Sequence, residues 1–370
     1  MFSMRAALGR AFQAALAVGE LSGLRLPPRL DPRPDVRRDT MGFMVDGELV
    51  RADRYRPSAP PRATLLLIPG AAAGGKDDPR LVRFALMLAH TRLLVVVPDI
   101  PALRQWQLLP EEGAHVSAAL RYVRAHADLN PSGCVGVGAF SVAIGPTVIA
   151  ASRVRVDFIM TVGGYYDLPR TLDYLTTGHY QTQGAAPTGT PNEYGKWVTA
   201  NSYADRLDSA HDRDLLGAIA KQKLRDRAAE VGDLARALGP QGRAVYSFIT
   251  NSDATRAAAL RSRLPEAIQA DIETLDLARH DLGALRTQWI IIHGRDDDII
   301  PCQESEALAA ALKARGTNHV QLFVLNGLEH VDRNAHARDG WTLWWAIYAL
   351  LTAADASRGQ RTVEERRAPK

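Results

Sequence analysis

The sequence predicts an α/β fold, in which a mostly parallel sheet is flanked by helices and a helical cap is inserted late in the sheet. Three observations support this. Apolar runs after Pro61 are continuous rather than alternating, which is typical of strands buried on both faces. Amphipathic segments of helix length separate most of these runs, as crossovers between parallel strands require. One connection, of about 120 residues, is far too long for an ordinary loop.

The elements of the core follow from this pattern in chain order. The expected strands are Thr64–Ile68, Leu93–Val97, Cys134–Val137, Val156–Val162, Trp289–Ile292 and Val320–Leu325. The expected helices are Leu81–Ala89, Glu111–His126, Ala143–Arg153, Gln303–Ala314 and Trp341–Ala354. Residues 42–167 and 288–354 are therefore expected to form one α/β core.

Residues 1–41 precede this core and divide into a helix and an arm. Apolar residues at near-helical spacing, with Arg5 and Arg10 among them, predict an amphipathic helix over Met1–Gly19. We expect this helix to pack on the core or to fray; a weak contact with a membrane surface and a cleaved signal peptide are the alternatives. Four prolines between Leu26 and Thr40 predict a proline-rich arm.

Three further segments have patterns of their own. From Gly42, short β-rich runs around an Asp-Gly turn predict a hairpin. Residues 168–287 form the long connection; their Ala, Leu, Arg and Lys content over Asp212–Leu238 and Leu264–Ala278 predicts helices, which we expect to cap the strand ends. Residues 355–370 are expected to be a disordered tail.

Composition narrows the class of protein. The chain has 370 residues, 46% of them apolar and 23% charged, as in ordinary globular proteins. Its two cysteines, Cys134 and Cys302, make no disulfide framework, and no Cys/His cluster has the spacing of zinc ligands, so a cytoplasmic location is expected.

The net charge of +4 is small for the length, and much of the basic excess lies at the two ends. Residues 1–38 hold seven arginines against three acids, and residues 355–370 hold five basic residues against three acids. A nucleic-acid partner would require a basic stripe with interleaved aromatic residues, which the sequence lacks. No nucleic-acid partner is therefore expected.

The run from Cys134 to Pro146 carries a first candidate for chemistry. It leads from a buried strand into a helix through small residues, with Ser141 at the turn and Ala139 and Ala143 on either side. Small residues allow a bend sharp enough to present the Ser141 hydroxyl at the sheet edge. The alternative is a serine that only caps the following helix.

Two later runs supply an acid and a histidine. The strand ending at Gly294 is followed three residues later by Asp297, and the strand ending near Leu325 is followed by a short loop that holds His330. The order nucleophile, acid, histidine along successive strands is that of one arrangement of the serine-histidine-acid triad.

At these residues the sequence resembles the α/β-hydrolase superfamily, over about Gly42 to Ala354. The resemblance implies that Ser141 is the nucleophile, Asp297 the orienting acid and His330 the general base. Asp297 is preferred to its neighbours Asp296 and Asp298 because it matches the family spacing G-x-x-D-x-x-(V/I)-P. Asp167, just beyond the strand that follows the nucleophile helix, remains a rival for the acid.

The resemblance also implies two backbone donors for an oxyanion. One is the N–H of Val142, which follows the nucleophile, and the other comes from the loop after the first parallel strand. By position the second donor is Ala71, with Ala72 as the alternative. This loop also fits G-x-x-x-x-G-K at Gly70–Lys76, but Asp77 stands where a nucleotide-binding loop needs Ser or Thr.

The function implied by the resemblance is a serine hydrolase that acts on a carboxylic ester or related small-molecule acyl substrate through an acyl-enzyme, with no cofactor. The alternatives are an acyltransferase or thioesterase that uses the same three residues, and a catalytically silent hydrolase fold that serves for binding.

Overall fold

The structure, a computed structural model, describes residues 4–24, 26–27, 29–45, 47–180, 189–285, 287–317, 319–326 and 339–367. Its centre is a sheet of eight strands in the order β1-β2-β4-β3-β5-β6-β7-β8. The strands are β1 (Val36–Val45), β2 (Glu48–Pro57), β3 (Ala63–Ile68), β4 (Leu93–Pro98), β5 (Val135–Phe140), β6 (Phe158–Val162), β7 (Gln288–Gly294) and β8 (Val320–Leu325). The hairpin β1–β2 joins β4 antiparallel, and the strands from β4 to β8 pair in parallel. The predicted mostly parallel sheet is confirmed.

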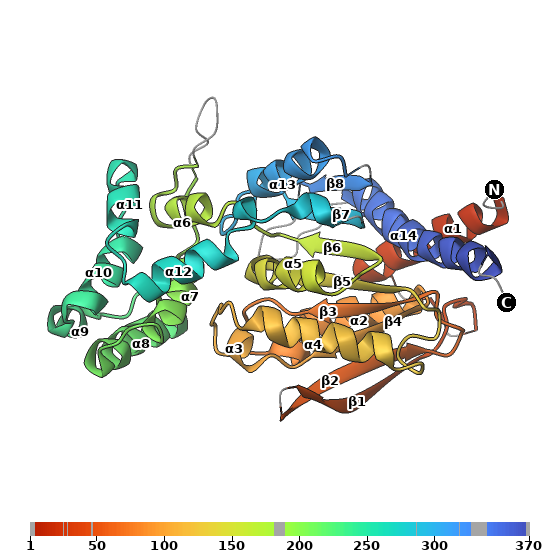
Figure 1. Cartoon of the computed structure of the whole chain (residues 1–370), viewed down its shortest axis with the longest axis horizontal. Coiled ribbons are helices and arrows are strands. Elements are labelled where there is room, and N and C mark those ends of the chain that lie inside the picture. Colours follow the sequence, from red (N-terminus) through yellow and green to blue (C-terminus); the bar gives the residue numbers. More distant parts are fainter. Residues whose placement is uncertain are drawn as a thin grey trace.

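Helices cover both faces of this sheet (Figure 1). The core helices are α1 (Met4–Leu21), α2 (Pro79–His90), α3 (Pro101–Arg104), α4 (Glu112–Ala125), α5 (Ile144–Arg153), α13 (Cys302–Ala314) and α14 (Gly340–Arg367). Short 3-10 turns are η1 (Gly75–Asp77) and η2 (Ser141–Ala143). One buried cluster contains side chains of α4, α5 and α13, and a second contains side chains of α1, α2 and α14.

These two clusters explain why the apolar runs of the parallel strands are continuous. In β3, Leu66 and Ile68 belong to the first cluster, whereas Leu65 and Leu67 belong to the second. Successive side chains of a strand point to opposite faces, so a strand covered on both sides needs apolar residues at every position. The six residues of β3 are accordingly all buried.

The insertion between β6 and β7 consists of helices, as expected. They are α6 (Leu168–Thr177), α7 (Glu193–Ala204), α8 (Ala210–Arg225), α9 (Gly232–Ala237), α10 (Pro240–Ile249), α11 (Ala254–Arg261) and α12 (Glu266–Leu275), followed by the 3-10 turns η3 (Leu277–Arg279) and η4 (Leu282–Ala284). In Figure 1 the helices α7 to α12 lie together at one end of the molecule, beyond the end of the sheet.

Two expected boundaries are wrong. The first strand begins at Val36 rather than near Gly42, because residues assigned to the arm pair with β2 through charged side chains, such as Asp39 with Arg54 at 2.9 Å. The residues from 355, expected as a disordered tail, continue α14 as far as Arg367. Asp355 anchors this extension, since its carboxylate accepts hydrogen bonds from Arg10 of α1 and from Arg62 before β3.

Within the described part of the chain, none of the helices is both long enough and apolar enough to cross a membrane.

Close packing of α5 against the neighbouring elements depends on Gly145. A Cβ atom at this position would lie 1.7 Å from the Tyr165 hydroxyl oxygen, and Tyr165 is fully buried with its hydroxyl donating to the Leu275 carbonyl at 3.1 Å. Any side chain at Gly145 would therefore displace Tyr165 or the whole of α5.

We expect Gly145→Ala to lower the free energy of unfolding by about 1–3 kcal/mol, because overpacking outweighs the gain in helix propensity. Denaturant unfolding followed by circular dichroism measures the change. The matched control is Gly9→Ala in α1, where a Cβ meets nothing within 4 Å, and a gain of about 0.5–1 kcal/mol is expected there. A stable Gly145→Ala protein would contradict this account of the packing.

Candidate active site

Ser141 lies at a sharp turn between β5 and α5. Its φ of 54° places it in the left-handed region, where only two other non-glycine residues of the described chain lie. A serine in this conformation is strained, and such strain is common at functional sites. The turn directs the chain from a central strand straight into a helix, as in a nucleophile elbow. Ser141 lines a large cavity.

The loop after β3 lies directly against this turn. A Cβ atom at Gly70 would be 3.6 Å from both the Phe140 carbonyl oxygen and the Ser141 Cβ. Ala71 and Ala72, the two candidates for the second oxyanion donor, follow Gly70 and line the same cavity, as does Val142. The structure thus brings together the backbone segments on which the sequence places both donors.

The orientation of the Ala71–Ala72 peptide is set from the insertion. The Tyr194 hydroxyl of α7 donates a hydrogen bond to the Ala71 carbonyl oxygen at 3.0 Å. Burial raises the pKa of this hydroxyl, so it stays protonated and remains a donor. Sequence reasoning missed Tyr194, because nothing in the run around it indicates a contact with a loop more than a hundred residues earlier.

The loop after β7 places its three consecutive aspartates in different surroundings. Asp297 is buried, lines the cavity, and accepts hydrogen bonds on Oδ1 from the N–H groups of Ile299 and Ile300 at 3.0 and 2.9 Å. Asp296 is exposed, and Asp298 accepts a hydrogen bond from the Asn192 side chain at 2.9 Å. Of these three carboxylates, only that of Asp297 is held at the cavity wall.

Asp167, the rival for the acid, caps α6. Its carboxylate accepts from the backbone N–H of Arg170 at 2.9 Å, and its own N–H donates to the buried Glu304 carboxylate at 2.7 Å. It is not among the residues that line the cavity. This position suits a helix cap better than a partner for a histidine beside Ser141.

Among the described histidines, His293 lies nearest to the acid. Its Nε2 is 3.4 Å from Asp297 Oδ2. The ring is fully buried, Nε2 is 2.8 Å from the Ile300 carbonyl oxygen, and Nδ1 is 2.6 Å from Ser305 Oγ. With both ring nitrogens bonded within the protein, His293 supports the loop rather than facing the cavity. His330, the predicted base, lies outside the described residues.

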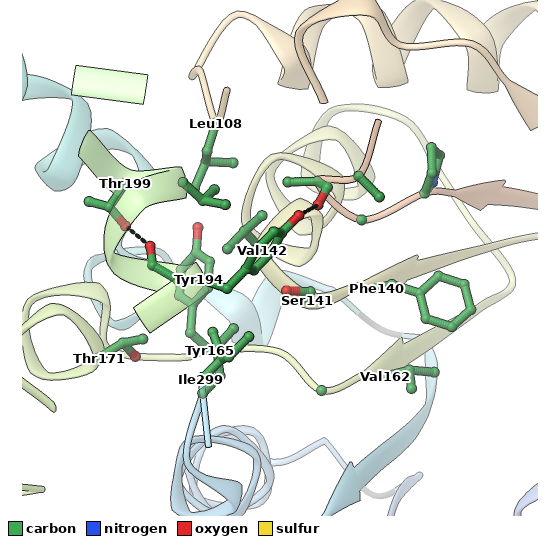
Figure 2. A pocket seen from close by; sticks show the side chains of 18 of the residues that line it. Leu108, Phe140, Ser141, Val142, Val162, Tyr165, Thr171, Tyr194, Thr199 and Ile299 are labelled. Atoms are coloured by element: carbon green, nitrogen blue, oxygen red, sulfur yellow. Dashed lines mark hydrogen bonds between the residues drawn. The ribbon is translucent and has the colours of Figure 1, made fainter. Parts of the chain in front are cut away.

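The cavity itself has a volume of about 340 Å³. Figure 2 shows Tyr194, Tyr165 and Ile299 grouped on one side of Ser141, with Phe140 and Val162 on the other. The insertion supplies further walls, mainly apolar, from three of its helices: Leu168, Leu172 and Leu175 of α6, Val198 of α7, and Ile272 and Leu275 of α12. An apolar chamber with few polar groups suits an acyl chain better than a charged or sugar-like ligand.

Polar contacts tie the insertion to the core around this cavity. The Arg206 guanidinium lies 2.6 Å from Glu111 before α4 and 2.5 Å from Asp271 of α12. The Asn201 side chain donates to the Gln105 carbonyl at 2.7 Å, and Ser202 Oγ accepts from the Leu108 N–H at 2.8 Å. These bonds fix the insertion to the core beside the cavity.

Of the tyrosines Tyr165, Tyr166, Tyr174 and Tyr180, only Tyr165 lines the cavity. Tyr174 and Tyr180 are buried against each other, with ring centroids 6.4 Å apart, and the Tyr180 hydroxyl donates to Glu304 at 2.6 Å. Tyr174 and Tyr180 are therefore packing residues.

The segment that resembles a nucleotide-binding loop has a structural explanation. The Lys76 ammonium is 3.2 Å from the buried Asp53 carboxylate and 3.0 Å from that of Asp77. These bonds fix the loop after β3 to the hairpin. In addition, no group of three or more His, Cys, Asp or Glu side chains that could hold a metal occurs in the described ranges.

Comparison with known proteins shows a similarity of fold. No protein-family model matches the chain, and no curated protein does. Among solved structures, LipA from Xanthomonas oryzae, a rice cell wall degrading esterase, is 16% identical, with 94% of this chain and 93% of that chain covered at a TM-score of 0.54. A 2,6-dihydroxy-pseudo-oxynicotine hydrolase is 13% identical, with 86% and 69% covered at a TM-score of 0.50.

Three observations indicate the same fold. They are the parallel sheet with its antiparallel hairpin at one edge, the left-handed turn at Ser141 between β5 and α5, and the similarity to LipA. The chain therefore has the α/β-hydrolase fold, which it shares with these two solved structures.

Proposed function

We propose that the chain is a serine hydrolase that cleaves carboxylic esters or related acyl substrates through an acyl-enzyme. The observation that carries the proposal is the left-handed turn at Ser141, at the wall of an apolar cavity that Asp297 also lines. The similar fold of LipA from Xanthomonas oryzae, an esterase, supports the same reaction class.

In the proposed reaction, His330 takes the hydroxyl proton of Ser141 while Oγ forms a bond to the substrate's carbonyl carbon. The N–H groups of Val142 and Ala71 donate hydrogen bonds to the oxyanion that results. The bond from carbon to the leaving oxygen then breaks, and His330 gives its proton to the departing alcohol. Water, deprotonated by His330, attacks the acyl-enzyme and releases the acid and Ser141.

Asp297 has the role of accepting a hydrogen bond from the His330 ring, which selects the tautomer able to receive the serine proton. Its Oδ1 already accepts two backbone N–H groups, and these hold the carboxylate in one orientation. A carboxylate that accepts such bonds is stabilised in its charged form, as this role requires.

The insertion has the role of a cap that selects the acyl group. Its helices α6, α7 and α12 supply much of the apolar wall of the cavity, so these helices would determine which acyl chain lengths fit. The reacting groups, by contrast, belong to the core.

We expect Ser141→Ala to abolish labelling by a fluorophosphonate and to lower turnover of a p-nitrophenyl ester by roughly 10⁴-fold or more, since no other nucleophile stands at the turn. Intact-protein mass spectrometry and initial rates measure the two effects. The control is Ser152→Ala, also on α5, whose Oγ bonds to the Ile149 carbonyl. Labelling that survives Ser141→Ala would refute the nucleophile.

For the acid, Asp297→Asn should lower kcat/KM by roughly 10³–10⁴-fold, because the amide favours the wrong tautomer of the base. Asp296→Asn and Asp298→Asn are matched controls in the same loop and should leave the rate nearly unchanged. Asp167→Asn should weaken the cap of α6 and so affect stability more than rate. If Asp167→Asn is instead the change that stops turnover, the acid is Asp167.

The role of the cap predicts that Leu172→Trp shortens the longest acyl chain accepted and lowers kcat/KM for longer esters by roughly tenfold, because the larger ring fills part of the cavity. Rates on p-nitrophenyl esters of increasing length give the profile. Fluorophosphonate labelling should be unchanged. Leu234→Trp, on α9 away from the cavity wall, is the control; an unchanged profile for Leu172→Trp would separate the insertion from substrate selection.

A further inference from the structure

The helix α1 presents its apolar residues in an unusual direction. Its buried face consists of Arg10, Ala14 and Ala17, whereas Met4, Leu8 and Phe12 are 78%, 63% and 56% exposed. A surface helix of a globular protein normally does the reverse, with large apolar side chains turned to the core. The three exposed side chains follow one another at intervals of four residues and form a stripe along α1.

Specific contacts hold α1 in this orientation. The Arg10 guanidinium donates to Asp355 of α14 at 3.1 Å and lies 5.5 Å from the centre of the Tyr348 ring. The Trp344 indole N–H donates to the Ala11 carbonyl at 3.0 Å. Small residues, a partly buried ion pair and the packing of Val18 and Leu21 thus hold the helix against the core, while Met4, Leu8 and Phe12 are left outside.

The start of α14, where Trp344 bonds to Ala11 of α1, exposes further large apolar side chains. Trp341 and Trp345 are 67% and 41% exposed, and Trp341 stacks on Trp344 with ring centroids 5.2 Å apart. We call the five side chains Met4, Leu8, Phe12, Trp341 and Trp345 the apolar face. Of the nine large apolar side chains exposed in the described part of the chain, five belong to this face, so the exposure is concentrated.

Charge favours one kind of occupant. Residues 1–38 carry seven arginines against three acids, and residues 356–370 carry five basic residues against two acids. The whole chain has a net charge of only +4, so the segments that contain α1 and the end of α14 are basic, while the rest is slightly acidic. Arg5, beside Met4, is itself exposed. An exposed apolar stripe beside the exposed Arg5, in a terminal segment with an excess of positive charge, suits a surface of anionic lipid.

The helix that carries most of the apolar face also reaches the cavity. Leu21, the last residue of α1, lines the cavity that contains Ser141. A Cβ at Gly340, the first residue of α14, would lie 3.9 Å from Val18 of α1. The two helices that carry the face therefore meet near the cavity, and Figure 1 shows them side by side.

We propose that the apolar face binds the surface of an anionic lipid layer and that the enzyme takes acyl esters from that layer. Tryptophan suits such a layer because its ring is mainly apolar while its N–H can bond at the headgroup level. The choice of substrate rests on the proposed hydrolase function, whereas the binding does not.

The test is co-flotation of the full chain with vesicles made of phosphatidylcholine and phosphatidylglycerol in equal parts. The unchanged chain should float with these vesicles, less so at high salt, and far less with phosphatidylcholine alone. Leu8→Ser combined with Phe12→Ser should lower the bound fraction at least about tenfold, because two large apolar side chains no longer enter the layer.

The matched control is Met44→Ser combined with Leu49→Ser. These two residues face each other across the hairpin and are 61% and 62% exposed, close to the 63% and 56% of Leu8 and Phe12. The control should float like the unchanged chain. Loss of flotation in both double variants, or failure of the unchanged chain to float with the mixed vesicles, overturns the proposal.

Two further readouts separate the remaining outcomes. Light scattering after size exclusion gives the oligomeric state. If the unchanged chain is a dimer that does not float, and only the variant with Leu8→Ser and Phe12→Ser is a monomer, the face binds a second copy and the proposal is overturned.

Rates on an ester dissolved in the vesicles should fall at least about tenfold in the variant with Leu8→Ser and Phe12→Ser, while rates on a water-soluble ester stay unchanged. Flotation is measured also with Ser141→Ala, so a failure of the hydrolase proposal leaves the binding test intact.

Discussion

The left-handed turn at Ser141 is the constraint on which the rest of the site depends. To turn within one residue from a central strand into a helix, the chain must bring α5 close to the sheet and to its neighbours. Gly145 permits this at Tyr165, and Gly164 permits it at Ile144, whose Cδ1 would lie 2.0 Å from an added Cβ. Glycines at 136 and 138 admit Phe158 and Met160 beside β5 in the same way. Packing around the turn holds the strained serine in place.

A buried carboxylate, that of Glu304, joins the insertion to the core. Glu304 is fully buried near the start of α13, and its carboxylate accepts the N–H groups of Tyr166 and Asp167 at 2.8 and 2.7 Å, together with the Arg170 side chain at 2.8 Å. Because α13 follows directly after the loop of Asp297, this one carboxylate sets the start of the insertion relative to the acid.

The C-terminal end of the insertion is hydrogen-bonded to residues at its N-terminal end. The Leu168 N–H donates to the Asp276 carboxylate at 3.1 Å, and the Ala278 N–H donates to the Tyr166 carbonyl at 3.0 Å. The chain therefore leaves and re-enters the core at nearly one point, although more than a hundred residues intervene. The position at which the insertion joins the core is therefore fixed beside the loop of Asp297.

The sequence predicts those features of the structure that depend on interactions between residues close together in the chain. Strands such as Leu93–Pro98 and the turn at Ser141 are specified by adjacent residues, through apolar runs and small side chains, and these were predicted closely. The bond from Tyr194 to Ala71 and the hub at Glu304 join residues more than a hundred positions apart, and neither has a local signature. The orientation of α1 was missed for a related reason. Its apolar spacing predicts an amphipathic helix, but which face turns inward depends on Asp355 and Trp344 at the opposite end of the chain, and their bonds to α1 outweigh the ordinary preference to bury Leu8 and Phe12.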